Sequence, residues 1–418
     1  MEAYVRILVL HQNKFDRLGY ANAFDHTRHD VTYAGTAGYI DTIPADVRCT
    51  RVVLEPDQPV VDQLRPRLLA WPPFDRILTR HELLIAPAAE LRAEFGVRGM
   101  RPDLARNFRD KVAMKTAVAG RGLRVPRFLP ATDLLKVDVE VPWRGRTIVK
   151  PRGGSASRGV SLCEDFHQAR EFVAREQRGD ASFAERYEVE EYVEGGLWQI
   201  DGFLFRGEPV AIQASRYVGS CLSFENGGPL GVVQRPHPEL EAFAVDCLRA
   251  LGGDTLTFHL EAITTPQGPV FLEAAARCGG GYTVTAFRRR TGIHLHTLDM
   301  ATEVADELAT EHIHAPETTE LHGEFQFPGH VYGGAPITVD VPAELLADPR
   351  VLTYQVYPAG KPTPMKGSYR PENLPLSGLI TDSDPDVLES WLSDLFAKVT
   401  VTPQSGVPAP LVAAQAAS

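Results

Sequence analysis

Two neighbouring segments, residues 257–264 and 269–274, most strongly limit the folds open to this chain. Both have the composition of β-strands, and the turn at 265–268, Thr-Pro-Gln-Gly, is typical of a hairpin. Each strand carries one glutamate among apolar neighbours, Glu261 and Glu273. Because an unpaired charge in such surroundings is costly, the pair favours a metal site over two exposed surface glutamates. Mg²⁺ is typically held by one or two carboxylates together with substrate phosphates.

Composition and charge narrow the class of protein. The chain has 418 residues, of which 44% are hydrophobic and 23% charged, and a formal net charge of −11. An acidic total without a basic run argues against a dedicated nucleic-acid binder. No apolar stretch approaches the ~18–20 residues of a membrane helix, and the five cysteines form no CxxC pair. We therefore expect a soluble, cytoplasmic protein with neither nucleic-acid nor membrane partners.

The order of the predicted elements indicates three folded parts and a tail. Residues 1–106 predict an α/β domain of Rossmann-like shape, without the glycine-rich fingerprint of dinucleotide binding. Residues 107–311 combine helices with long strand-like segments. Residues 312–401 have short strands, Gly/Pro turns and one late helix, which predicts a small α+β domain. Residues 402–418 are rich in Pro, Ala, Ser and Gln and predict a flexible tail.

Lys150 ends the strand-like segment 147–151 and precedes a loop of small residues, Arg-Gly-Gly-Ser-Ala-Ser-Arg-Gly-Val, at 152–160. Backbone N–H groups in such a loop can bind phosphate, and the lysine supplies a point charge. Taken alone, this pattern is more often a flexible turn. Lys111 lies in a helix predicted over 107–122 and could be a second phosphate-binding cation, although alone it would be an exposed helix lysine.

Two further motifs lie on either side of the hairpin. Residues 190–195, Glu-Glu-Tyr-Val-Glu-Gly, predict a strand that leads into a hinge. Such a hinge can bind adenine through backbone groups and one carboxylate, whereas in isolation it would be an exposed acidic edge. Arg277 follows Glu273 by four residues and precedes Cys-Gly-Gly-Gly. It could hold a carboxylate or phosphoryl group in a bidentate manner, or simply neutralise the two glutamates.

In this order, from about residue 107 to residue 308, the motifs resemble the ATP-grasp superfamily, and the spacing of twelve between Glu261 and Glu273 matches its pattern. Within the biotin-carboxylase-like branch, the chain is similar to the bacilysin-type L-amino acid ligases that make dipeptides. Thr-Arg-His-Glu at 79–82, Phe-His-Leu-Glu and Glu-Ala-Ala-Ala-Arg carry this resemblance. It implies an ATP-grasp fold, α/β plus α+β, with a pre-ATP-grasp domain before it. The ATP-grasp domain would divide into 107–195, with the phosphate loop, and 196–311, with the metal-binding strands.

The resemblance also implies residue roles. Lys111 and Lys150 would bind the phosphates of ATP, the loop would cover them, and Glu190 with the backbone of Glu191 and Val193 would bind adenine. The implied ATP-binding residues are Lys111, Lys150, Ser155, Ser157, Gly159, Glu190, Glu191 and Val193. Glu261 and Glu273 would bind Mg²⁺, for which Mn²⁺ could substitute, and Arg277 with Lys150 would be catalytic. The implied substrate residues are Glu82, His259, Gly280 and Gly281.

The reaction implied by the resemblance is ATP-dependent joining of a carboxylate to an amine through an acyl phosphate. The expected partners are small-molecule carboxylates and amines, such as amino acids or short peptides, and a second copy in a homodimer. His259 and Glu82 are candidate bases. Glycines at 279–281 leave room for a substrate larger than alanine, or only permit a tight turn beside phosphate. A carboxylase or purine-pathway ligase remains an alternative, as does a non-catalytic ATP-binding regulatory protein.

Overall fold

The N-terminal part is a parallel α/β layer. The computed structural model describes residues 4–136, 139–154 and 157–404. The sheet has the strand order β3-β2-β1-β4, with apolar strands buried as expected for parallel sheets. Its strands are β1 (Arg6–Leu10), β2 (Asp30–Gly35), β3 (Thr50–Val53) and β4 (Arg76–Thr79).

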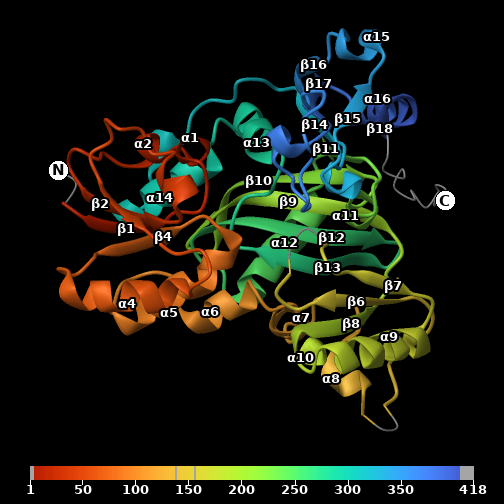
Figure 1. The fold of residues 1–418 in the computed structure, drawn as a ribbon, viewed down its shortest axis with the longest axis horizontal. Coiled ribbons are helices and arrows are strands. Elements are labelled where there is room, and N and C mark those ends of the chain that lie inside the picture. Colours follow the sequence, from red (N-terminus) through yellow and green to blue (C-terminus); the bar gives the residue numbers. More distant parts are fainter. Residues whose placement is uncertain (1–3, 137–138, 155–156, 405–418) are drawn as a thin grey trace.

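Helices cover both faces of this sheet. The helices α4 and α5 pack on one face, and α1, α2 and α14 cover the other (Figure 1). The bounds of these helices are α1 (Phe15–Leu18), α2 (Tyr20–Ala23), α3 (Ala37–Ile40), α4 (Val60–Ala70), η1 (Glu82–Leu84), α5 (Ile85–Glu94) and α14 (Leu295–Ala305).

The helix predicted over 107–122 is shorter in the structure, where α7 covers Lys111–Ala119 and a separate helix, α6 (Pro102–Asn107), precedes it. The side chain of Asp110 accepts hydrogen bonds from the backbone N–H groups of Val112 and Ala113 and so caps α7. This cap makes Lys111 the first residue of α7, where its backbone N–H donates to the carbonyl of Arg152.

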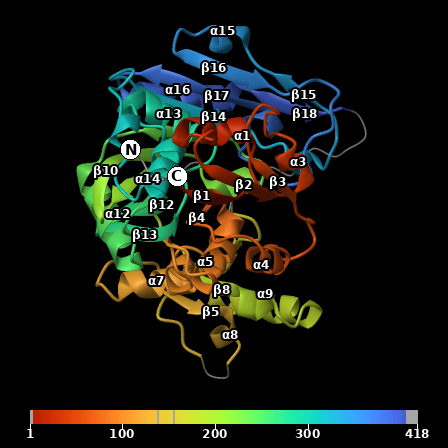
Figure 2. The same ribbon diagram turned by 90° about the vertical axis from the view of Figure 1, so that its left-hand side faces the viewer.

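A small antiparallel sheet of order β5-β8-β6-β7 follows, with helices packed on one face. Its strands are β5 (Phe128–Pro130), β6 (Thr147–Pro151), β7 (Ser161–Cys163) and β8 (Tyr187–Glu191). The helices are α8 (Ala131–Leu134), α9 (Phe166–Gly179) and α10 (Phe183–Arg186). In Figure 2 this unit lies at the lower end of the molecule, opposite the C-terminal strands.

The core of the molecule is an eight-stranded antiparallel sheet of order β13-β12-β9-β10-β11-β14-β17-β16. Its strands are β9 (Gly196–Phe205), β10 (Glu208–Val218), β11 (Leu230–Gln234), β12 (Leu256–Thr265), β13 (Gly268–Ala275), β14 (Leu321–Gln326), β16 (Val351–Val356) and β17 (Leu376–Asp382). The helices α7 and α12 pack against one part of this sheet, and α16 packs against β11, β14 and β17.

The remaining elements surround this sheet. A two-stranded ribbon pairs β15 (Ile337–Asp340) with β18 (Thr400–Pro403). The helices are α11 (Cys221–Glu225), α12 (Pro238–Leu251), α13 (Thr283–Thr291), α15 (Ala343–Leu346) and α16 (Pro385–Lys398). Short 3-10 helices are η2 (Thr310–His312), η3 (His330–Tyr332) and η4 (Pro371–Asn373). No helix within the described ranges combines the length and apolarity needed to span a bilayer.

The C-terminal part differs from the prediction in two ways. The strands β14, β17 and β16 continue the central sheet, because β14 pairs with the edge of β11, so the segment 312–401 shares its sheet with 196–275. The predicted tail at 402–418 begins too early, since hydrogen bonding to β15 extends β18 to Pro403. Residues 405–418 lie outside the described residues.

Candidate active site

A large open cleft lies where the N-terminal domain, the small sheet, the central sheet and the C-terminal segment meet. It has a volume of ≈ 1580 Å³. His81, Lys111, Lys150, Glu261 and Arg370 all line it, although they come from five different parts of the chain. Ligand sites occur preferentially at such junctions, because side chains from separate elements can converge there.

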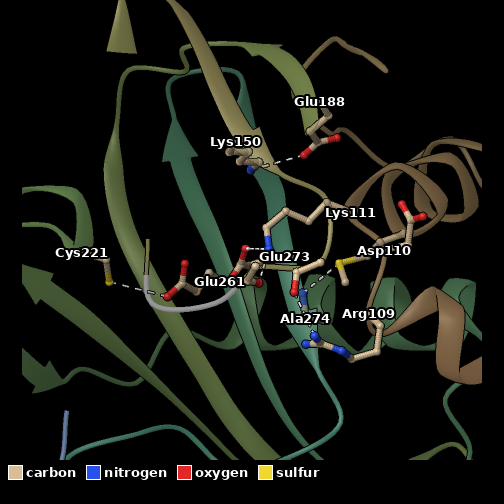
Figure 3. Close-up of polar contacts among 12 residues, drawn as sticks. Arg109, Asp110, Lys111, Lys150, Glu188, Cys221, Glu261, Glu273 and Ala274 are labelled. Atoms are coloured by element: carbon tan, nitrogen blue, oxygen red, sulfur yellow. Dashed lines mark hydrogen bonds and ion pairs between the residues drawn. The ribbon is translucent and has the colours of Figure 1, made fainter. Parts of the chain in front are cut away.

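The two glutamates of the hairpin lie directly opposite each other, in register on β12 and β13 (Figure 3). The hydroxyl of Tyr217 donates to Glu261 Oε1 at 2.9 Å, and Cys221 Sγ lies 3.8 Å from the same oxygen. Glu273 Oε2 pairs with Lys111 Nζ at 2.8 Å. Burial alone would raise the pKa of Glu273, but Lys111 and Lys150 lower it to about 2 overall. Glu273 is therefore a carboxylate at neutral pH.

This donor set fits Mg²⁺ or Mn²⁺ shared with a phosphate ligand. Carboxylate oxygens are the hard ligands that these cations prefer. Within the described part of the chain, no group of three or more His, Cys, Asp or Glu could hold a metal ion. The paired glutamates therefore suit an ion whose remaining ligands come from water and phosphate oxygens.

Lys111 and Lys150 approach the cleft from α7 and from the end of β6. Lys111 Nζ also donates to the carbonyl of Gly154, at 3.0 Å, which brings the start of the glycine-rich loop beside Glu273. Ser157 lines the cleft. Gly159 lies close to Tyr187, because a Cβ added to this glycine would be 3.0 Å from the Tyr187 hydroxyl. Ser155, predicted to bind phosphate, lies outside the described residues.

Lys150 belongs to a buried charge cluster that the sequence motifs only partly predicted. Its Nζ pairs with Glu190 at 2.6 Å and lies 3.9 Å from Glu188. Lys115, which is fully buried, pairs with Glu188 at 2.7 Å and also with Glu190. Burial alone would lower the pKa of Lys150, but the surrounding glutamates raise it overall. The carboxylate of Glu190 thus holds two lysines, and its contact with adenine stays a prediction.

The sequence motifs did not identify Lys115 as the partner of the two glutamates of β8. It follows Lys111 by four residues, next to the core residues Met114 and Val118 of α7. A lysine at an apolar position of a helix needs a buried counter-ion. The alternation Glu188-Val189-Glu190 places both carboxylates on one face of β8, and this pattern indicates where the counter-ions of such a lysine lie.

The hinge after β8 borders the cleft through Glu191, Tyr192 and Val193. The side chain of Glu191 accepts a hydrogen bond from the backbone N–H of Arg127, at 2.9 Å. The backbone of Val193 makes no hydrogen bond to another backbone group of the described residues. The binding of adenine by this backbone stays a prediction.

Arg277 is held across the cleft by the N-terminal domain. Its Nε lies 2.6 Å from Glu82 Oε2, and Arg109 pairs with the other oxygen of Glu82. Burial alone would raise the pKa of Glu82, but Arg277 and Arg109 lower it overall. A carboxylate with a lowered pKa is a weak base. Glu82 therefore fits a residue that positions Arg277 better than it fits a general base.

We expect Glu82→Gln to lower kcat by about tenfold, since an amide cannot hold two guanidiniums and Arg277 loses its orientation. ATP affinity should change little, because the partners of Glu82 are Arg109 and Arg277 and not the lysines of the phosphate site. Initial rates and calorimetry with an ATP analogue measure the two quantities. Glu90→Gln, an exposed glutamate in α5, is the matched control. An equal loss in ATP affinity and kcat would contradict the positioning role.

The surroundings of His259 also disfavour a role as a base. Its Nδ1 lies 3.0 Å from Asp201 Oδ1, and its Nε2 lies 3.7 Å from Glu261 Oε1. Burial alone would lower the pKa of His259, but these two carboxylates raise it to about 10. The imidazole is therefore protonated at neutral pH and acts as a cation between Asp201 and Glu261.

The glycines after Arg277 have different surroundings. Gly279 and Gly280 line the cleft. Gly281 has a φ of 57°, and a Cβ there would collide with the side chains of Gln326 and Glu324 on β14. Gly281 thus faces β14 instead of lining the cleft. Any side chain at Gly281 would be strained, which favours the tight turn over substrate space as the reason for this glycine.

Parts of the chain are similar in sequence to other proteins. No family model matches the chain. An uncharacterised protein of Sinorhizobium fredii is 26% identical over 208 residues, which are 48% of this chain and 42% of that protein. Dapdiamide A synthase of Enterobacter agglomerans is 28% identical over 144 residues, 32% of this chain and 33% of the synthase. Alanine–anticapsin ligase of Bacillus subtilis is 24% identical over 278 residues, 61% of this chain and 58% of the ligase. The chain thus matches less than two thirds of each relative's length.

Solved structures match over nearly the whole chain. An L-amino acid ligase from Bacillus licheniformis has a TM-score of 0.70 at 18% identity, with 97% of this chain and 100% of that chain covered. N5-carboxyaminoimidazole ribonucleotide synthetase from Thermotoga maritima has a TM-score of 0.61 at 13% identity, covering 96% and 100%. A biotin carboxylase domain dimer from Hydrogenobacter thermophilus, with MgADP and bicarbonate, has a TM-score of 0.59 at 13% identity, covering 98% and 92%.

Proposed function

Because the chain has the ATP-grasp fold, we propose that it is an ATP-dependent ligase that joins a carboxylate to an amine. The predicted fold class is confirmed by the likeness to solved ATP-grasp enzymes over nearly the whole chain. The observation that carries the proposal is the convergence in one cleft of two facing carboxylates, two lysines and one arginine. These are Glu261, Glu273, Lys111, Lys150 and Arg277.

The proposed reaction has two steps. A substrate carboxylate attacks the γ-phosphorus of ATP, the bond to the bridging oxygen breaks, and ADP leaves. An amine then attacks the acyl carbon of the acyl phosphate, and inorganic phosphate leaves as the C–N bond forms. The amine nitrogen gives up a proton. Both steps depend mainly on positioning and charge neutralisation.

Each charged residue has a distinct task in this scheme. Lys111 and Lys150 stand at one end of the cleft and bind phosphate oxygens. Bound at Glu261 and Glu273, Mg²⁺ would offset negative charge on the transferring phosphoryl group. Arg277, oriented by Glu82, stabilises the charge that develops on the acyl oxygen.

An amino acid or short peptide is the proposed carboxylate substrate. Dapdiamide A synthase and alanine–anticapsin ligase, whose names denote such chemistry, support this choice, as does the likeness to an L-amino acid ligase. The carboxylase and purine-type alternatives are supported only by folds of lower TM-score. A homodimer is proposed because the biotin carboxylase domain of similar fold is a dimer.

ADP release separates these possibilities. The protein is incubated with MgATP and single amino acids, pairs of amino acids, bicarbonate or formate, and ADP is measured in each case. We expect release with amino acids, highest with a productive pair. Release with bicarbonate alone would favour the carboxylase alternative. ATP binding without release under any condition would favour the non-catalytic alternative.

Lys150→Ala should weaken ATP binding about 10- to 100-fold, because one charge-assisted bond to phosphate is lost. The affinity for the carboxylate substrate should change much less. Isothermal calorimetry with a non-hydrolysable ATP analogue measures the first quantity. Lys136→Ala, which removes an exposed lysine of the same unit, is the control. Unchanged ATP affinity in Lys150→Ala would contradict the role of this residue.

A further inference from the structure

A small polar chamber lies beside the cleft, between the central sheet and α13. It has a volume of ≈ 20 Å³, and its polar lining includes Gln199, Asp201, Gln213, Ser215, Thr283 and Glu324. Gln199, Thr283 and Glu324 line both this chamber and the cleft, so the two spaces adjoin. A cavity of this size holds one or two groups of the size of a water molecule.

One oxygen in the chamber wall has no hydrogen-bond partner among the residues that the structure describes. Asp201 is only 2% exposed, and its Oδ1 accepts a hydrogen bond from the backbone N–H of Gly279, at 3.0 Å. The same oxygen contacts His259 Nδ1. Asp201 Oδ2 is buried and finds no hydrogen-bond donor among the described residues. A buried carboxylate oxygen without a donor is costly, so the chamber is built to receive an N–H or O–H group.

The chamber holds two carboxyl groups, Asp201 and Glu324, and Asp201 already pairs with His259 through its Oδ1. Glu324, 6% exposed, accepts a hydrogen bond from the backbone N–H of Tyr282. Burial raises the pKa of Glu324 to about 8, and the charge of Asp201 contributes to this rise. No lysine or arginine of the described residues lines the chamber. A cation that enters would meet Glu324 and the Oδ2 of Asp201, while His259 contacts the other oxygen of Asp201.

The chamber lies next to the place where the carboxylate substrate must react. Gly279, whose N–H binds Asp201, follows Arg277 by two residues. A Cβ at Gly279 would be 2.9 Å from Asp201 Oδ1, so glycine here keeps the backbone close to the chamber wall. A substrate held by Arg277 therefore has the chamber within reach of its other functional groups.

We propose that this chamber binds a primary ammonium group of the carboxylate substrate, with Asp201 and Glu324 as specificity-determining residues. The inference rests on the proposed function. An ammonium carries three N–H donors and is compact enough for ≈ 20 Å³, whereas a ring is not. The ammonium comes from the α-amino group or from the side chain, and substrates that carry one or the other distinguish these sources.

The test measures acyl activation with hydroxylamine as the amine, so that the natural amine need not be known. Matched acids are compared as substrates: lysine, norleucine and 6-aminohexanoate, then ornithine, norvaline and 5-aminopentanoate, then 2,3-diaminopropionate, alanine and β-alanine. If the side-chain ammonium enters the chamber, the diamino acids should exceed their apolar counterparts by about 100-fold in kcat/KM. If the α-ammonium enters, the ω-amino acids should be the poor substrates.

Glu324→Gln should reduce whichever preference is found by at least tenfold, with ATP affinity unchanged. Glu320→Gln, at a half-buried site outside the chamber lining, is the matched control. Equal kcat/KM for all three members of each set, or a preference that Glu324→Gln leaves intact, overturns the inference and indicates a chamber filled by water. If Glu324→Gln does not fold, the comparison of acids in the wild-type protein decides alone. Failure of every acid to release ADP overturns the proposed function instead.

Discussion

Glu273→Gln is expected to abolish turnover and to leave the protein folded. The amide keeps the shape of the side chain but removes the charge that would bind Mg²⁺ opposite Glu261. Loss of one metal carboxylate from a phosphoryl-transfer site should cost several kcal/mol of transition-state stabilisation, or roughly 10³-fold in kcat. ADP release at saturating Mg²⁺ measures the effect. Because the amide removes the carboxylate partner of Lys111, thermal unfolding is measured in parallel to show that the variant stays folded.

Glu194→Gln is the control for this experiment. Glu194 lies in the hinge beyond β8, its side chain is 83% exposed, and it pairs with Arg146. The same chemical change there should leave turnover near normal. Near-normal ADP release by Glu273→Gln at saturating Mg²⁺ would show that the metal assignment is wrong. A loss that Mn²⁺ partly restores would support it, because Mn²⁺ accepts the same oxygen ligands.

Lys115→Met should be the most destabilising single substitution in the site. Methionine fits the apolar neighbours of α7, but Glu188 and Glu190 would then share Lys150 as their one remaining cation in the cluster. Breaking a buried ion pair by removal of one partner costs about 3–5 kcal/mol. Denaturant unfolding measures this loss as a fall in the free energy of unfolding.

The double variant Lys115→Met with Glu188→Gln separates the charge effect from a packing effect. Glu188 is fully buried, and its Oε2 has no partner among the described residues. Removing its charge should recover part of the lost stability, since fewer buried anions remain uncompensated. Lys136→Met, on the exposed surface, should change stability by less than about 0.5 kcal/mol. No recovery in the double variant would mean that the loss arises from packing.

The elements that the sequence predicted well are those set by local pattern. The hairpin of β12 and β13 has strand-forming residues, a Pro-Gln-Gly turn and one glutamate in each strand, and its register brings the two glutamates face to face. The helix α12 carries the local signals of its ends, since proline begins it at Pro238 and Gly252 ends it. The helix α7 was predicted too long at its start, because the cap at Asp110 was not recognised.

The pairs that organise the site could not be predicted, because their partners are far apart in the sequence. Glu82 and Arg277 are 195 residues apart, and Lys115 and Glu188 are 73 residues apart. Each motif alone suggests a charged residue that could be exposed. Only the fold shows that these charges are buried, paired and therefore costly to remove.

The amino-acid sequence by itself determined the strands of the hairpin, the facing glutamates and the order of the charged motifs, because these depend on spacing along the chain. The tertiary structure decided which lysine supports Glu190, which carboxylate orients Arg277 and why His259 is a cation, because burial and charge depend on neighbours from other elements. It also decided that β14 continues the central sheet, and so placed Glu324 beside Asp201, since strand pairing between distant segments leaves no local signal in the residues that pair.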